Sequence, residues 1–135
     1  MEKLNFAKQF FLKLGFGRIT ISSPEEHDRV IAYTSQLAHI VSSSYMKSPT
    51  AERHAGFSAG SFRDMTRVAE LNENMWNELF LQNDDFLSEE ITLLINNLQA
   101  FNNAIKEKNK EALLELLIEG KKQKRKIDEL ELKHR

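Results

Sequence analysis

The sequence predicts an all-α fold, a bundle of about five main helices, and three observations support this. Five glycines and two prolines are the only strong helix breaks among 135 residues. Apolar side chains recur at helical spacing over long stretches, as they do at Leu94, Leu98 and Phe101. Residues 23–26, Ser-Pro-Glu-Glu, combine an N-cap residue, a proline at the first helical position and an acidic first turn. A long helix is therefore expected to begin at Pro24.

Length and composition exclude several classes of protein. A chain of 135 residues corresponds to about one domain. Its net charge of −1 predicts no strong attraction to nucleic acid, and no window is apolar enough for a membrane span. The absence of cysteine excludes disulfides, thiolate metal sites and cysteine nucleophiles, and it is compatible with a reducing, cytoplasmic location.

The N-terminal residues do not match the rest of the chain. Residues 3–14 carry a helical apolar stripe that Gly15 should end, and residues 18–22 alternate apolar and polar as a short strand does. A lone strand cannot satisfy its own backbone and needs a partner. We therefore interpret 1–22 as the last helix and strand of a larger α/β unit, followed by a helical domain over 23–135.

The remaining elements follow from caps and apolar spacing. Residues 47–60 are expected to form a loop or a short helix with a turn. The last two helices carry broad apolar stripes, which suit a bundle and a helix-mediated dimer. The expected helices cover residues 24–46, 61–71 with Ser61 as cap, 75–81, from Asp84-Asp85 to about Ile105, and from Asn109 onward, with high charge beyond Gly120.

Polar side chains interrupt the predicted helix 24–46. Ser35 and His39 lie four residues apart and therefore on one face. The serine hydroxyl could fix the imidazole tautomer or share a ligand with it, whereas spacing alone favours a buried, satisfied histidine. His27 and His39 are twelve residues apart and out of helical register, so they do not form a metal-binding pair.

Two arginines share a face of the next predicted helix. Arg63 and Arg67 are four residues apart, and Asp64 is close enough in sequence to hold Arg67 in place. A guanidinium held this way can bind a substrate carboxylate with two hydrogen bonds. The alternative is a surface salt-bridge cluster, which the spacing alone favours.

Two further features have ordinary interpretations. Trp76, the single tryptophan, is more readily a core anchor than one wall of a ligand site. The basic run over 121–126 is surrounded by acidic residues and has no interleaved aromatics, so it is best interpreted as a solvated helix end. No glycine-rich dinucleotide loop, P-loop or nucleophile elbow occurs in the sequence.

Three linked motifs resemble the C-terminal half of prephenate dehydrogenases. They are His27-Asp28-x3-Ala32-x2-Ser35-x3-His39, Phe62-Arg63-Asp64-x-Thr66-Arg67-x-Ala69, and Met75-Trp76. The similarity runs from about Gly15 to Asn83. It implies a parent enzyme with an N-terminal Rossmann domain for NAD or NADP and a dimerising, all-helical C-terminal domain. Residues 3–22 would then be the last helix and strand of the Rossmann domain.

The resemblance also implies an activity and roles for eight residues. The family oxidatively decarboxylates prephenate to 4-hydroxyphenylpyruvate, or arogenate to tyrosine. Where family members often read Ser-His-Leu-Pro-His, this chain has Gln36 and Ala38 in place of the first histidine and the proline. The resemblance implies that Arg67 binds a substrate carboxylate and that Asp64 and Arg63 orient and gate the site. His39, Ser35 and Trp76 would line the pocket, with His39 near the tyrosine site of feedback-inhibited members. His27 would lie near the interdomain cleft, and Gly60 would approach the partner subunit.

By the same resemblance, the catalytic residues and the dinucleotide loop belong to the Rossmann half. We therefore expect this chain to form a homodimer, to hold no catalytic residue, cofactor or metal of its own, and to lack dehydrogenase activity alone. Prephenate, arogenate and tyrosine are the expected small-molecule ligands. The competing hypothesis is a non-catalytic helical dimer that binds tyrosine or prephenate, or has a purely structural role.

Overall fold

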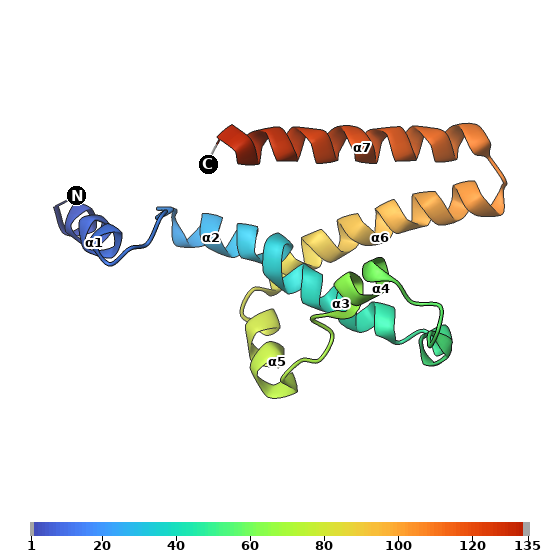
Figure 1. The fold of residues 1–135 in the computed structure, drawn as a ribbon, viewed down its shortest axis with the longest axis horizontal. Coiled ribbons are helices and arrows are strands. Elements are labelled where there is room, and N and C mark those ends of the chain that lie inside the picture. Colours follow the sequence, from blue (N-terminus) through green and yellow to red (C-terminus); the bar gives the residue numbers. More distant parts are fainter. Residues whose placement is uncertain (1, 134–135) are drawn as a thin grey trace. The chain divides into compact units, whose positions relative to one another are not determined.

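The computed structural model describes residues 2–133, which are mainly helical and include no strand (Figure 1). The chain divides into two compact units at Leu87–Ser88. No described helix is both long enough and apolar enough to cross a membrane. The elements are α1 (Glu2–Lys13), α2 (Pro24–Ile31), π-helix η1 (Ala32–Leu37), α3 (Ala38–Met46), 3₁₀-helix η2 (Pro49–Arg53), α4 (Gly60–Thr66), α5 (Glu73–Leu81), α6 (Asp84–Lys106) and α7 (Lys110–Lys133).

Helix α1 ends where the sequence predicts. Gly15 has a φ of +94°, a conformation that suits glycine because it has no Cβ. The N–H of Phe16 donates to the carbonyl of Phe11 at 3.2 Å, and the N–H of Gly15 donates to the carbonyl of Leu12 at 3.1 Å. These two bonds define a Schellman motif, and the rings of Phe11 and Phe16 meet edge to face with centroids 5.6 Å apart.

The strand expected over 18–22 is wrong, because the described residues include no strand and this segment is irregular. A strand forms only when a neighbour takes up its backbone hydrogen bonds, and this segment has no such neighbour in the described residues. Its apolar residues Ile19 and Ile21 instead line a shallow cavity together with Leu4 and Phe11 of α1. The assignment of 1–22 to a separate α/β unit stays a prediction.

The long helix expected over 24–46 is confirmed as the run α2–η1–α3. Ser23 caps it, because its hydroxyl accepts a hydrogen bond from the N–H of Glu26 at 3.1 Å, and Pro24 occupies the first turn. Its middle is a π-helix, a form that is rare and frequently found at functional sites. The π-helix buries three side chains, those of Ala32, Gln36 and Leu37, and α3 buries Ser42.

Helices α4 and α5 differ from the predicted bounds. Helix α4 begins at Gly60, with Ala59 rather than Ser61 at the N-cap position, and it ends at Thr66 instead of residue 71. Residues 67–72 are not helical. The helix ends early because the carbonyl of Val68 bonds to the side chain of His39 in α3 instead of to a helical N–H. Helix α5 begins two residues before the predicted start, because Asn72 caps it through the N–H of Met75 at 3.0 Å.

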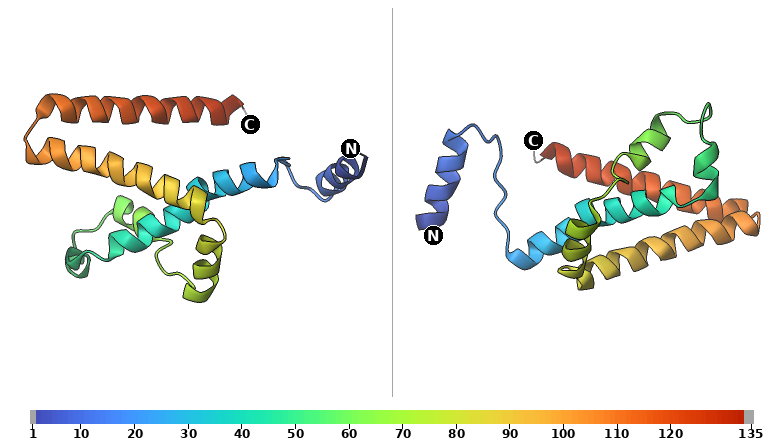
Figure 2. Two further views of the ribbon diagram at one scale, coloured as in Figure 1. Left: turned by 180° about the vertical axis from the view of Figure 1, so that it is seen from behind. Right: turned by 90° about the horizontal axis from the view of Figure 1, so that it is seen from below.

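The second unit is an antiparallel pair formed by most of α6 and by α7 (Figures 1 and 2). The predicted start of α7 is confirmed, because the Asn109 side chain accepts a hydrogen bond from the N–H of Ala112 at 3.0 Å. Both helices expose apolar side chains. Those more than half exposed include Leu93, Leu98 and Ile105 of α6 and Leu114, Leu117 and Ile118 of α7.

We expect the substitution Lys108→Gly in the α6–α7 turn to stabilise the fold by about 1 kcal/mol. Lys108 has a φ of +52°, which is strained for a residue with a Cβ, and it occupies the position that glycine prefers at a helix end. The urea midpoint measures the change. The control Lys122→Gly, inside α7, should destabilise the fold by a similar amount. If Lys108→Gly destabilised the fold, the backbone of Lys108 would not be strained.

Candidate functional site

His39 of α3 is the centre of the best-defined group of predicted site residues. Its side chain is half-buried, and its Nδ1 lies 3.1 Å from the carbonyl oxygen of Val68. A carbonyl can only accept a hydrogen bond, so Nδ1 carries the proton and Nε2 of the neutral imidazole is an acceptor. The ring of Trp76 in α5 lies against the imidazole, with centroids 4.0 Å apart. Three segments therefore hold one imidazole in a defined orientation.

Ser35 does not fix the tautomer of His39, so this one of the two possibilities for the pair is not realised. The carbonyl of Val68 performs this task instead. Ser35 lies in η1, is half-buried, and its hydroxyl forms no hydrogen bond within residues 2–133. The interpretation that the spacing favoured, a buried and satisfied histidine, holds for the Nδ1 side of the ring, but the side chain is only half-buried and Nε2 remains an available acceptor.

Trp76 makes contacts that are compatible with both interpretations, a core anchor and one wall of a ligand site. The indole is half-buried and contacts His39 on one side and Phe80 on its own helix, with ring centroids 5.2 Å apart. The contact with Phe80 suits a packing anchor. The contact with a polar ring suits one wall of a ligand site, because indole is flat, polarisable and able to stack on another ring.

A buried amide network next to His39 is the feature that sequence reasoning missed. Gln36 is 6% exposed and donates from Nε2 to the carbonyl of Leu79 at 3.1 Å. Asn83 donates from Nδ2 to Oε1 of Gln36 at 2.8 Å and to the carbonyl of Asp28 at 2.9 Å. Two of the acceptors in this network are the main-chain carbonyls of Leu79 and Asp28, and a pattern of side chains cannot predict them. The available signal was Gln36 itself, a polar residue one helical turn before His39.

Arg63 of α4 and Arg67, which follows the helix, lie at the surface. Arg63, Asp64 and Arg67 are all exposed, and Arg67 is the C-cap residue with φ −54° and ψ −33°. Within residues 2–133 neither guanidinium forms an ion pair, so the expected Asp64–Arg67 contact is not made, and neither is the alternative surface cluster. Arg67 immediately precedes Val68, whose carbonyl bonds to His39, so the backbone carrying this guanidinium is attached beside the imidazole.

His27 and Gly60 take no part in this group of contacts. His27 is exposed in the first turns of α2, and its Nδ1 lies 2.9 Å from Oδ1 of its neighbour Asp28. Gly60 is the first residue of α4, and a Cβ added there would meet open space. Among residues 2–133 no group of three metal-ligating side chains comes together.

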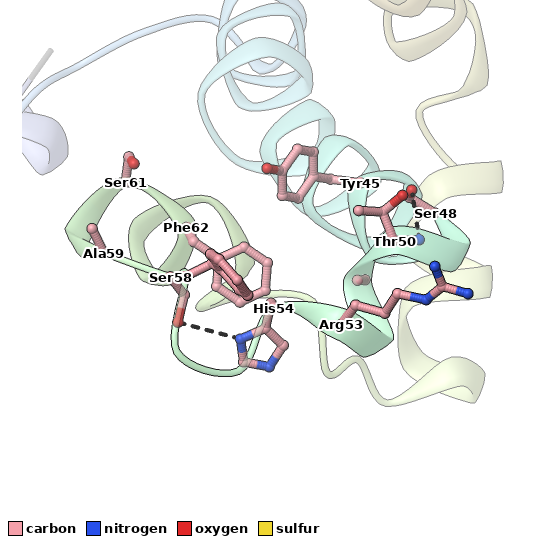
Figure 3. Close-up of a pocket in the computed structure, with 11 residues that line it drawn as sticks. Tyr45, Ser48, Thr50, Arg53, His54, Ser58, Ala59, Ser61 and Phe62 are labelled. Carbon is pink, nitrogen blue, oxygen red and sulfur yellow. Dashed lines mark hydrogen bonds between the residues drawn. The ribbon is translucent and has the colours of Figure 1, made fainter.

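An open cavity of about 580 Å³ lies between the end of α3, η2 and the start of α4. Figure 3 shows its aromatic side, where His54 stacks on Phe62 with centroids 4.6 Å apart and Tyr45 approaches from α3. Nδ1 of His54 lies 3.3 Å from the hydroxyl of Ser58. None of the eight predicted site residues lines this cavity, so the cavity is separate from the His39 group.

The first unit is thus a helical domain in which the imidazole of His39 is held against the indole of Trp76, next to the segment that carries the exposed Arg67. Comparison with known protein families gives the particular family. The family described as "Prephenate dehydrogenase, dimerization domain" matches residues 23–119. The chain therefore belongs to the family of prephenate dehydrogenase dimerization domains.

Named relatives agree with this membership. The chain is 35% identical over 128 residues to cyclohexadienyl dehydrogenase of Zymomonas mobilis, covering 90% of this chain and 43% of the relative. It is 30% identical over 112 residues to prephenate dehydrogenase of Lactococcus lactis, covering 78% of this chain and 31% of the relative. The chain thus spans less than half the length of these curated relatives.

Solved structures extend the comparison to the fold. Prephenate dehydrogenase of Aquifex aeolicus, in complex with hydroxyphenyl propionate and NAD+, matches with a TM-score of 0.73 and 28% identity, over 93% of this chain and 46% of the other. Arogenate dehydrogenase of Synechocystis matches with a TM-score of 0.76 over 93% of this chain and 48% of the other, and at 21% identity it supports the fold alone.

Proposed function

We propose that this chain is the helical C-terminal domain of an NAD(P)-dependent prephenate or arogenate dehydrogenase of tyrosine biosynthesis. It would contribute the substrate pocket and the dimer interface for oxidative decarboxylation. The observation that carries the proposal is the His39–Trp76 contact, joined through Val68 to the segment that bears Arg67, in a chain of this family.

The substrate would be held by groups of complementary chemistry. The guanidinium of Arg67 would bind a carboxylate with two hydrogen bonds. His39 would accept a hydrogen bond at Nε2 from the ring hydroxyl, while the indole of Trp76 packs on the six-membered ring. The proposed supporting roles are those of Ser35 as a further pocket hydroxyl, Asp64 and Arg63 in orienting and gating, His27 at the interdomain cleft, and Gly60 near the partner subunit.

The residues of this chain do not fit a dinucleotide. The sequence contains no glycine-rich loop of the kind that cradles a pyrophosphate. NAD or NADP would be held by residues outside this sequence, and the chain alone is proposed to have no dehydrogenase activity. Production of NADH from prephenate and NAD by the purified chain would contradict this part of the proposal.

A homodimer is proposed on two grounds. The family is described as a dimerization domain, and α6 and α7 expose rows of leucine and isoleucine side chains that association would remove from water. Sedimentation equilibrium of the purified chain should give twice the 15.7 kDa chain mass. The cytoplasmic location expected from the sequence stays a prediction.

Calorimetry with 4-hydroxyphenylpropionate, prephenate and tyrosine tests the proposed pocket. We expect saturable binding of the first two compounds to the purified chain, because Arg67, His39 and Trp76 all belong to it. If none of the three compounds binds, this result would contradict a retained substrate site and favour the purely structural dimer. Binding of tyrosine alone would favour the non-catalytic sensing module.

A further inference from the structure

We infer that Gln36 and Asn83 are positioning residues that hold α5, and with it Trp76, against His39. Neither side chain has an assigned role in the proposed site. The consequence for ligand binding rests on the proposed function, whereas the geometric part does not. The inference starts from the buried amide of Gln36, which is bonded on both sides.

The network and the ring contact join the same two segments. His39 contacts Trp76, and one turn earlier Gln36 bonds to the carbonyl of Leu79, which lies one turn after Trp76. The two contacts therefore lie one helical turn apart on both helices. The Gln36 bond fixes the distance between η1 and α5, and it resists movement of the indole away from the imidazole.

Asn83 adds a third point of attachment. It follows the end of α5, and its Nδ2 donates both to Oε1 of Gln36 at 2.8 Å and to the carbonyl of Asp28 at 2.9 Å. The Asp28 carbonyl belongs to α2 and Gln36 to η1, so this one amide ties the end of α5 to two separate points of the long helix. Trp76 is thus held from the end of its helix as well as from its middle.

The donor and acceptor pattern at Gln36 is specific. One N–H meets a carbonyl, which can only accept, and Oε1 meets an N–H of Asn83. Both amide groups of a nearly fully buried side chain are used, so an apolar replacement leaves a carbonyl and an N–H without partners. A neutral histidine also has one donor and one acceptor, whereas methionine has a similar length and neither group.

The test uses Trp76 as its reporter, because the chain has one tryptophan. We expect Gln36→Met to shift the fluorescence of Trp76 to the red and to raise its quenching by acrylamide, as α5 moves away from His39. The affinity for 4-hydroxyphenylpropionate should fall by about threefold or more, with unchanged helical circular dichroism. The matched control Gln123→Met, exposed on α7, should change none of these.

In Gln36→His, the emission and the affinity should be close to those of the unsubstituted chain, because histidine keeps one donor and one acceptor. If the side chain at position 36 only filled space, histidine would have no such advantage over methionine. Asn83→Ala should shift Trp76 in the same direction as Gln36→Met, and it replaces that variant if Gln36→Met fails to fold. Unchanged emission and quenching in folded Gln36→Met, or a Gln36→His variant that behaves like it, would overturn the inference. If the unsubstituted chain binds no ligand while the emission shifts occur, the proposed function fails and the positioning role stands.

Discussion

Replacement of Arg67 by alanine is expected to weaken the binding of 4-hydroxyphenylpropionate by at least about tenfold. A hydrogen bond to a charged group contributes about 1.5–3 kcal/mol, and about 1.4 kcal/mol corresponds to a factor of ten in affinity. Arg67 is exposed and has no ion-pair partner within residues 2–133, so its guanidinium is available to a ligand without breaking another contact. Isothermal titration calorimetry measures the change.

Two controls separate a carboxylate clamp from a general effect of charge. Arg67→Lys keeps the charge but loses the planar fork, so its affinity should lie between those of the unsubstituted chain and Arg67→Ala. Arg125→Ala removes an exposed arginine from α7 and should leave the affinity unchanged. Equal affinities for the unsubstituted chain and Arg67→Ala would remove Arg67 from the proposed site.

The largest effect on stability is expected for Leu37→Ala, which should lower the free energy of unfolding by about 2–5 kcal/mol. Leu37 is the last residue of the π-helix and is 7% exposed. Shortening it removes apolar contacts and leaves a cavity in the first unit, which can relax only in part. The urea midpoint, with an unchanged slope, reports the loss.

The matched control is Leu81→Ala, at the end of α5. Leu81 is 66% exposed, so the same truncation should change the free energy of unfolding by less than about 0.5 kcal/mol. If the two variants have similar urea midpoints, Leu37 is not packed in the core of the first unit. The position of the π-helix that carries Ser35 and Gln36, and that precedes His39, would then not be fixed by this packing.

The helix starts could be predicted because their signals are local. Ser23 caps α2 and Asn109 caps α7, and in each case the hydrogen bond spans three residues. Gly15 ends α1 for an equally local reason, its positive φ. The errors occurred where a distant group decides the conformation. The expected strand over 18–22 lacks a neighbouring strand, and α4 ends early where the carbonyl of Val68 bonds to His39 instead of continuing the helix.

The candidate site was predictable in its residue types and less so in its contacts. The resemblance to prephenate dehydrogenases drew attention to His39, Trp76 and Arg67, and the structure brings the first two into contact. In the structure, the imidazole bonds to the Val68 carbonyl and not to Ser35. Asp64 and Arg67 form no ion pair in the described part of the chain. Side-chain spacing cannot predict which main-chain carbonyl another helix will present.

By itself, the sequence determined that this protein is helical, where most of its helices begin, and which family it resembles, because caps, turn residues and apolar spacing act over a few neighbouring residues. Only the tertiary structure decided how the site residues are held. The hydrogen bond from His39 spans 29 positions of the sequence, and the one from Gln36 spans 43. Such bonds form only after distant helices have packed, because packing alone brings a buried amide and a carbonyl within bonding distance.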